Sequence, residues 1–196
     1  MKLATIANGT RDGALVVISR DGERYLEARE TAPTLQAAVD SWADTEPKLR
    51  ALAATLDQRG GSPAGDIRFL APLPRAWQWL DGSAFKSHGD LMERVFGIDP
   101  VPQDKPLMYQ GMSHRFLSAT EDVEFLREED DIDFEGELGI ITDDVPMGTS
   151  AAAAMNHIKL IVQINDWSLR KLAPAEMKTG FGWIQAKPAC SMAPFA

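Results

Sequence analysis

The stretch that most constrains the fold is DIDFEGELGIITDD, residues 131–144, where acids alternate with other residues and then lead into an apolar run. Successive side chains of a strand point to opposite faces, so a strand over 133–142 gathers these acids on one face. The acids that share that face are Asp133, Glu135 and Glu137. A second stretch, HIKLIVQIND, predicts another half-buried strand. Its apolar face holds Ile158, Leu160, Val162 and Ile164.

Acids on one strand face repel one another, and Glu and Asp are poor strand formers, so the face is either solvated or opposed by a cation. Side chains two residues apart begin about 6.5–7 Å from each other, near enough for Glu135 and Glu137 to converge on one ion. A hard divalent cation such as Mg²⁺ takes oxygen ligands and removes the repulsion. Taken alone, the pattern is more often a solvated strand edge.

The first 62 residues predict a small α+β unit of two or three short strands and two helices. The dipeptides Asn8-Gly9, Asp12-Gly13 and Asp21-Gly22 suit tight turns between the strands. The helices fall within 34–61 and show ordinary start and stop signals. These signals are Thr34 and Thr45 as N-caps, Pro47 in the first turn of the second helix, and Gly60-Gly61 at its end.

Residues 62–65, SPAG, are expected to be a linker, which divides the chain into an N-terminal domain, 1–62, and a second domain, 63–196. The second domain is predicted to begin with an apolar strand at DIRFL, followed by a helix around 86–96 and irregular sequence through Tyr109. Ala151 to Met155 suit a short helix capped by Thr149 or Ser150. The last residues, WIQAKPACSMAPFA, are predicted to be a strand or loop that stops in mid-fold.

Composition restricts the class of protein and of partner. A net charge of −9 and a pI of about 4.8 argue against nucleic acid or an anionic membrane as the main partner. A single cysteine, Cys190, forbids an intramolecular disulfide and favours a reducing cytoplasm, and we expect it to be a small core residue. No signal peptide or membrane-spanning run is present. Three scattered His and one Cys make zinc a poor candidate.

Other polar residues stand where strands begin or end. Asp166 follows IKLIVQIN directly, where loops commonly carry function, although a turn or cap role is the commoner one. Asp81 and His88 lie in WLDGSAFKSHGDL beside the predicted helix start, and a lone His there is more often structural or exposed. Lys187 lies among apolar neighbours, where its ammonium needs either a partner or a path to water.

Four blocks together resemble the fumarylacetoacetate hydrolase family, which includes fumarylacetoacetase and related hydratases, decarboxylases and isomerases of 2-oxo acids. The blocks cover roughly residues 66–196 and are APLPRAWQWLDGSAFKSH, DFEGELGIITDDVPMG, QINDWSLR and GWIQAKPACSMAPFA. The resemblance implies an α+β fold in which a small N-terminal α/β unit precedes a mixed, β-rich roll. In this chain the roll is expected to be truncated at its C-terminus.

The resemblance also assigns roles to residues. It implies Mg²⁺, or Ca²⁺ or Mn²⁺, held by Asp81, Glu135, Glu137 and Asp166, with His88 as general base. Lys187 matches a lysine near the oxyanion and metal, and Tyr109 and Ser191 match substrate-binding positions. Ser83 departs from the family, which has an aromatic substrate contact there in the fumarylacetoacetase branch.

The implied activity is metal-dependent cleavage of a C–C bond in a 1,3-diketo or 2-oxo acid, in aromatic or organic-acid catabolism. The alternatives are 2-oxo acid hydration, decarboxylation or tautomerisation through the same enolate chemistry, or a non-catalytic metal-binding domain. The resemblance further implies a homodimer. Four tryptophans in the second domain give weak support, since tryptophan is favoured at interface cores. They are Trp77, Trp79, Trp167 and Trp183.

Overall fold

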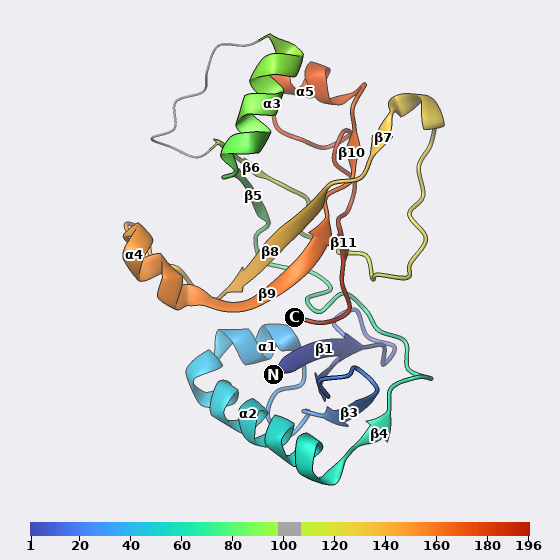
Figure 1. Ribbon diagram of the computed structural model, residues 1–196, viewed down its shortest axis with the longest axis vertical. Helices are drawn as coiled ribbons and strands as arrows, with labels where there is room; N and C mark the ends of the chain where they lie inside the picture. The colour runs from blue at the N-terminus through green and yellow to red at the C-terminus, as the bar shows by residue number, and fades with distance from the viewer. Residues whose placement is uncertain (98–106) are drawn as a thin grey trace.

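The computed structural model describes residues 1–97 and 107–196. The chain folds as α+β, with an N-terminal sheet and its two helices at one end and a group of small antiparallel sheets at the other (Figure 1). The two ends of the chain meet, because Leu3 and Ala196 exchange backbone hydrogen bonds of 2.9 and 3.0 Å. The fold therefore returns its last residues to the first strand.

The N-terminal sheet is antiparallel, in the order β1-β2-β3-β4. Its strands are β1 (Lys2–Ile6), β2 (Ala14–Ile18), β3 (Arg24–Glu27) and β4 (Ser62–Pro63). Glycines of the three predicted turn dipeptides have positive φ, which confirms the tight turns. Ser62 and Pro63 were expected to be linker, but they pair with β3. The boundary at residue 62 stays a prediction.

Helices α1 (Leu35–Asp40) and α2 (Trp42–Arg59) pack on this sheet around Leu3, Leu35 and Leu49, all essentially inaccessible to solvent. Thr34 caps α1 by accepting a hydrogen bond from Ala37 N, as predicted. The prediction that Thr45 is an N-cap is wrong.

Helix α2 begins three residues before Thr45, so Thr45 lies within it and Pro47 stands beyond the first turn. The Thr45 hydroxyl instead donates 2.7 Å to the carbonyl of Ala38, which ties α2 to α1. A buried hydroxyl needs a partner, and the end of α1 supplied one that the helix signal did not reveal. Gly60 ends α2 with φ 72°, as predicted.

In the second domain, β8 (Gly136–Thr142), β9 (Ile158–Asn165) and β11 (Ser191–Met192) form an antiparallel sheet in the order β11-β9-β8. The alternation predicted for β9 is confirmed, with its even-numbered residues from 160 to 164 buried. The single strand predicted over 133–142 is interrupted at 134–135. Its first part is β7 (Ile132–Asp133), which pairs with β10 (Ser168–Leu169).

A third pairing, β5 (Leu80–Ser83) with β6 (Leu107–Gln110), was not predicted. Residues 98–106 of the expected irregular segment lie outside the described residues. The strand predicted at DIRFL is reduced to one bridge between Ile6 and Phe69, because the extended chain meets only the end of β1.

The helices of the second domain are short. Helix α3 (Lys86–Phe96) confirms the prediction, and α4 (Ala151–Ala154) is capped by Ser150, one of the two residues expected. Helix α5 (Ala173–Thr179) was not predicted. Two single-turn 3₁₀ helices, η1 (Glu128–Asp130) and η2 (Met155–His157), complete the elements of the described part of the chain.

Candidate active site

Strands β8 and β9 place two acids side by side where the hairpin meets the rest of the domain. The Asp166 N–H donates 3.0 Å to the carbonyl of Glu135, and the Glu135 N–H donates 3.0 Å to the side-chain oxygen of Asn165. These two bonds hold the start of β8 against the end of β9. The segments that carry Glu135 and Asp166 are therefore fixed to each other.

The second pairing, β5 with β6, adds Asp81 and Tyr109, which oppose each other across the two strands. The Tyr109 hydroxyl donates a short hydrogen bond to Asp166. Burial, followed by the charge of Asp166, raises the pKa of Tyr109 above its usual range, so the phenol keeps its proton. Tyr109, predicted to bind substrate, thus lies against a predicted metal ligand.

Three carboxylates converge at this place. One oxygen from each of Asp81, Glu137 and Asp166 lies within 4.8 Å of the other two. Asp81 and Glu137 are partly exposed, while Asp166 is 1% exposed. This all-oxygen donor set, from β5, β8 and the residue that follows β9, is suited to a hard divalent cation such as Mg²⁺, Ca²⁺ or Mn²⁺.

Two of these carboxyl groups have raised pKa values because they are buried close to one another. Burial, then the charges of Asp81 and Asp166, raises the pKa of Glu137 to about 7. Burial and the charge of Asp166 likewise raise the pKa of Asp81. A divalent cation would offset this repulsion, so the residues present fit a metal.

Glu135, the fourth predicted ligand, stands apart from the triad. One of its oxygens accepts a short hydrogen bond from Arg170, and the other lies 2.7 Å from Lys187 Nζ. Burial favours the neutral acid, but the two cations outweigh it and lower the pKa of Glu135. The structure places Glu135 beside the site as an ion-paired carboxylate, and its role as a ligand stays a prediction.

Lys187 is buried, with 8% of its surface exposed, and does not extend to water. Its ammonium lies 2.9 Å from Asp166 Oδ2 and 5.5 Å from the centre of the Tyr109 ring. Burial opposes the charge, yet Asp166 and Glu135 together raise the pKa of Lys187. A permanent cation is therefore held at the edge of the carboxylate triad.

His88 and Ser191 are less directly involved. His88 is exposed on α3. Its effect on the pKa of Asp81 is smaller than that of burial. Ser191, on β11, accepts a 2.9 Å hydrogen bond from the indole of Trp167. The structure brings neither side chain into the triad, so both roles stay predictions.

Comparison with known proteins identifies the family. The family model described as fumarylacetoacetate (FAA) hydrolase C-terminal matches residues 78–196, and that for fumarylacetoacetase N-terminal domain 2 matches residues 1–75. The chain belongs to the fumarylacetoacetate hydrolase family. Members of this family are enzymes. No curated protein matches the chain in sequence.

Solved structures confirm the fold of this family. A candidate HpcE protein from Mycobacterium smegmatis superposes with a TM-score of 0.76 at 16% identity. A fumarylacetoacetate hydrolase from psychrophilic Exiguobacterium antarcticum gives 0.64 at 17%, and a 5-carboxymethyl-2-hydroxymuconate delta-isomerase from M. smegmatis gives 0.60 at 20%. Each covers the whole of this chain, which spans 65% of the length of each of these structures.

Sequence reasoning missed two residues that hold the site together. Arg170 bridges Asp133 and Glu135, and the Cys190 thiol donates 2.9 Å to Asp166 Oδ1. Burial and the charge of Asp166 raise the pKa of this thiol, so it stays neutral. Both residues lie inside blocks that carry the family resemblance, but nothing in their spacing indicated their partners.

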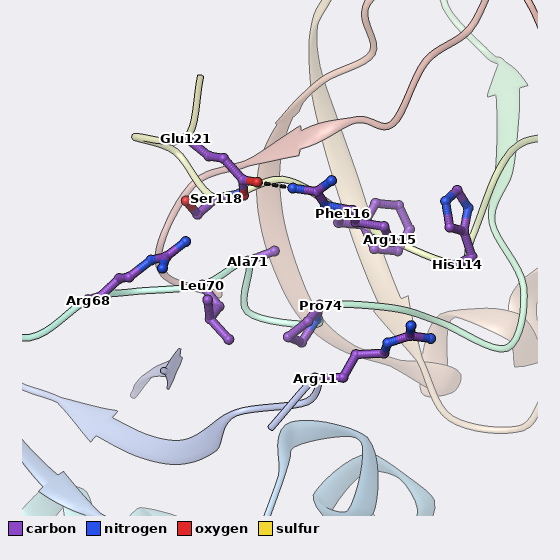
Figure 2. A pocket seen from close by; sticks show the side chains of 10 residues that line it. All are labelled: Arg11, Arg68, Leu70, Ala71, Pro74, His114, Arg115, Phe116, Ser118 and Glu121. Atoms are coloured by element: carbon purple, nitrogen blue, oxygen red, sulfur yellow. Dashed lines mark hydrogen bonds and ion pairs between the residues drawn. The ribbon is translucent and has the colours of Figure 1, made fainter. Parts of the chain in front are cut away.

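A separate cavity of about 270 Å³ is lined by residues of the second domain and by Arg11 of the N-terminal domain. Figure 2 shows that Arg11, Arg68, His114 and Arg115 line it, with Arg115 paired to Glu121. None of the predicted site residues lines this cavity, and its basic lining is unsuited to a cation. The carboxylate triad, and not this cavity, is therefore the candidate cation position.

No helix in the described ranges is long and apolar enough to cross a membrane.

Proposed function

We propose that this chain carries the metal-binding part of an enzyme that cleaves a C–C bond in a 1,3-diketo or 2-oxo acid. The observation that supports this most strongly is the convergence of Asp81, Glu137 and Asp166 next to the buried ammonium of Lys187. A cation site and a fixed positive charge side by side suit a reaction in which negative charge develops on substrate oxygen.

Bound there, Mg²⁺, Ca²⁺ or Mn²⁺ would act as a Lewis acid on substrate oxygens. Asp81, Glu137 and Asp166 would hold it, with Glu135 as a fourth ligand. Lys187 would donate a hydrogen bond to the oxygen that becomes negative when the C–C bond breaks. Its ion pairs with Glu135 and Asp166 keep it charged and in place for that role.

Tyr109 and Ser191 would orient the substrate, and His88 would take the proton from the attacking water. His88 is exposed on a helix that starts three residues after the strand carrying Asp81, which supports access to the site from solvent. If the reaction is C–C hydrolysis, His88→Ala should remove most turnover and leave metal affinity nearly unchanged. Loss of metal affinity together with turnover would contradict a base role.

A second reaction class, isomerisation, is supported by the likeness to the 5-carboxymethyl-2-hydroxymuconate delta-isomerase. Hydration, decarboxylation and tautomerisation of 2-oxo acids need the same oxygen activation. Hydration adds water without breaking a C–C bond, and the other two reactions consume no water. Assay of acylpyruvates and of 2-oxo acids side by side, with Mg²⁺ or Mn²⁺, separates these reactions. Metal binding without turnover on either panel would leave the non-catalytic metal-binding alternative.

Calorimetry with Mg²⁺ and Mn²⁺ tests the ligand set. Glu137→Gln and Glu135→Gln should each weaken binding about tenfold or more, since each removes a charged oxygen ligand. An exposed acid elsewhere, Glu124→Gln, is the control and should bind as the parent does. Unchanged affinity in Glu135→Gln would remove this residue from the ligand set, and unchanged affinity in both would mean that the acids only face solvent.

We also propose a homodimer in the cytoplasm. The outer face of the β8–β9 hairpin exposes Leu138, Ile140 and Ile161, each more than half accessible, and β8 is an edge strand. Such a face is suited to a partner surface. The tryptophans support this less than expected, because only Trp77 is largely exposed while Trp79, Trp167 and Trp183 pack on other rings. Light scattering should give twice 21.5 kDa, and a monodisperse monomer would contradict the proposal.

A further inference from the structure

Glu176 makes an unusual set of contacts on α5. Its carboxylate accepts hydrogen bonds from three consecutive backbone N–H groups, those of residues 184, 185 and 186, at 3.1, 2.8 and 2.9 Å. Burial opposes its charge, but these bonds outweigh burial and lower the pKa of Glu176. One ionised side chain thus fixes the path of the segment that ends immediately before Lys187.

The same segment is held from its other side. The carbonyl of Ala186 accepts a 2.8 Å hydrogen bond from the N–H of Leu169 on β10, and Ala186 is fully buried. The peptide groups on both sides of Ala186 are therefore bonded, one to α5 and one to β10. Lys187 follows directly, and its ammonium meets both Glu135 and Asp166.

We propose that Glu176 is a positioning residue that sets the place of the Lys187 ammonium in the site. The loop 180–186 includes two glycines with positive φ, Gly180 and Gly182, so it has few restraints of its own. The three bonds to Glu176 supply those restraints. The loop also carries Trp183, whose ring packs 5.7 Å from that of Tyr109, so its path affects a second residue of the site.

The inference deepens the proposed function and rests on it for the catalytic consequence, but its structural part can be tested without turnover. Glu176→Gln is the sharpest variant, because an amide of the same shape can still accept the two N–H groups bonded to Oε1. Its NH₂ group cannot accept from Ala186, so the bond nearest Lys187 is lost. Glu176→Asp, one methylene shorter, is the second variant.

The first measurement is the rate of reductive methylation of Lys187 in the folded protein, followed by peptide mass spectrometry. The buried, ion-paired amine of the parent should react slowly. Glu176→Gln should raise the rate about tenfold, the change that corresponds to loss of one charge-assisted hydrogen bond, and Glu176→Asp should raise it too. Lys178→Ala, an exposed change on the same helix, is the control and should leave the rate unchanged. An unchanged rate in both Glu176 variants would overturn the proposal.

The second measurement is a double-mutant cycle on kcat/KM. Glu176→Gln should lower kcat/KM in the parent, and should have almost no effect when Lys187→Met is already present, because its action passes through Lys187. An equal loss in both backgrounds would overturn positioning and indicate a general structural role. If the parent turns over no 2-oxo or diketo acid, the proposed function fails, and the methylation rates alone decide the role of Glu176.

Discussion

The ammonium of Lys187 lies 2.9 Å from the carboxylate of Asp166, and both side chains are buried. Asp166 also belongs to the carboxylate triad, so one buried acid contacts a permanent cation and is also a candidate metal ligand. The ammonium of Lys187 and a cation at the triad would both be attracted to the Asp166 carboxylate and would repel each other, so each would weaken the binding of the other. A cation bound at the triad would therefore be repelled by a fixed positive charge.

Replacing Lys187 with Met should destabilise the protein without metal and strengthen metal binding. Removing one partner of a buried pair leaves Asp166 uncompensated, which costs about 3–5 kcal/mol. A divalent cation would then offset that charge without a competing ammonium. Thermal melts at pH 8 should show a larger rise in Tm on adding Mg²⁺ for Lys187→Met than for the parent. Lys171→Met, an exposed change, is the control. A smaller Mg²⁺-induced rise in Lys187→Met would contradict the competition.

Glu137→Gln should stabilise the metal-free protein at high pH. The pKa of Glu137 is raised to about 7 in the folded state, against 4.5 ordinarily, so the folded protein holds this proton more tightly than the unfolded chain. Protonated Glu137 therefore contributes to folding stability below pH 4.5, and this contribution is lost as the pH rises through about 7. Gln imitates the protonated acid at every pH and keeps that contribution.

Urea unfolding in the presence of a chelator, at pH 5 and pH 8.5, checks this expectation. The stability of the parent should fall relative to that of Glu137→Gln between the two pH values. In matched samples with Mg²⁺ and no chelator, Mg²⁺ should stabilise the variant less than it stabilises the parent. Glu124→Gln serves as the comparison, since it changes the same group at an exposed position. Equal pH dependence in the parent and in Glu137→Gln would show that Glu137 is not crowded by Asp81 and Asp166.

Local signals in the sequence predicted much of the fold. Thr34 and Ser150 cap helices, Gly60 ends one, and the alternation of β9 matches its buried face, because each feature depends on neighbouring residues. The predictions that failed concern residues whose partners are distant in the sequence. Thr45 bonds to the end of another helix, and β5 and β6 have little apolar alternation of their own but pair with each other across 23 intervening residues, 84–106.

The site divides in the same way. Alternation predicted that acids near 133–137 share a face, and strand ends pointed to Asp166. Local sequence also singled out Asp81 and Lys187, but only the family resemblance assigned their roles. No pattern indicated that Arg170 and Lys187 would occupy both oxygens of Glu135. Ion pairing depends on which side chains the tertiary fold brings within reach, and the sequence does not encode those distances locally.

Gly13→Ala should destabilise the N-terminal domain strongly. Gly13 has φ 61°, and a Cβ there would lie 2.5 Å from Thr5 Cγ2 and 2.6 Å from the backbone oxygen of Ile6. The positive φ costs about 1–2 kcal/mol and the overlap about 1–3 kcal/mol more. Gly9→Ala is a matched control, with φ 86° and no atom near the new methyl, so it should show only the first cost. Equal losses of unfolding free energy in both variants would contradict the overlap.

Thr5→Val should weaken the connection between the two domains. Thr5 is fully buried on β1, and its hydroxyl donates 2.6 Å to the carbonyl of Pro72, near the start of the second domain. Valine has nearly the same shape but no donor, so the buried carbonyl would lose its partner at a cost of about 1–3 kcal/mol.

Urea unfolding measures this loss, and Mg²⁺ calorimetry should show unchanged affinity because Thr5 is remote from the triad in the chain and in its contacts. Thr55→Val, at a partly exposed helix position where water can replace the hydroxyl, should cost much less. Equal costs for the two threonines would mean that the bond to Pro72 adds nothing to stability.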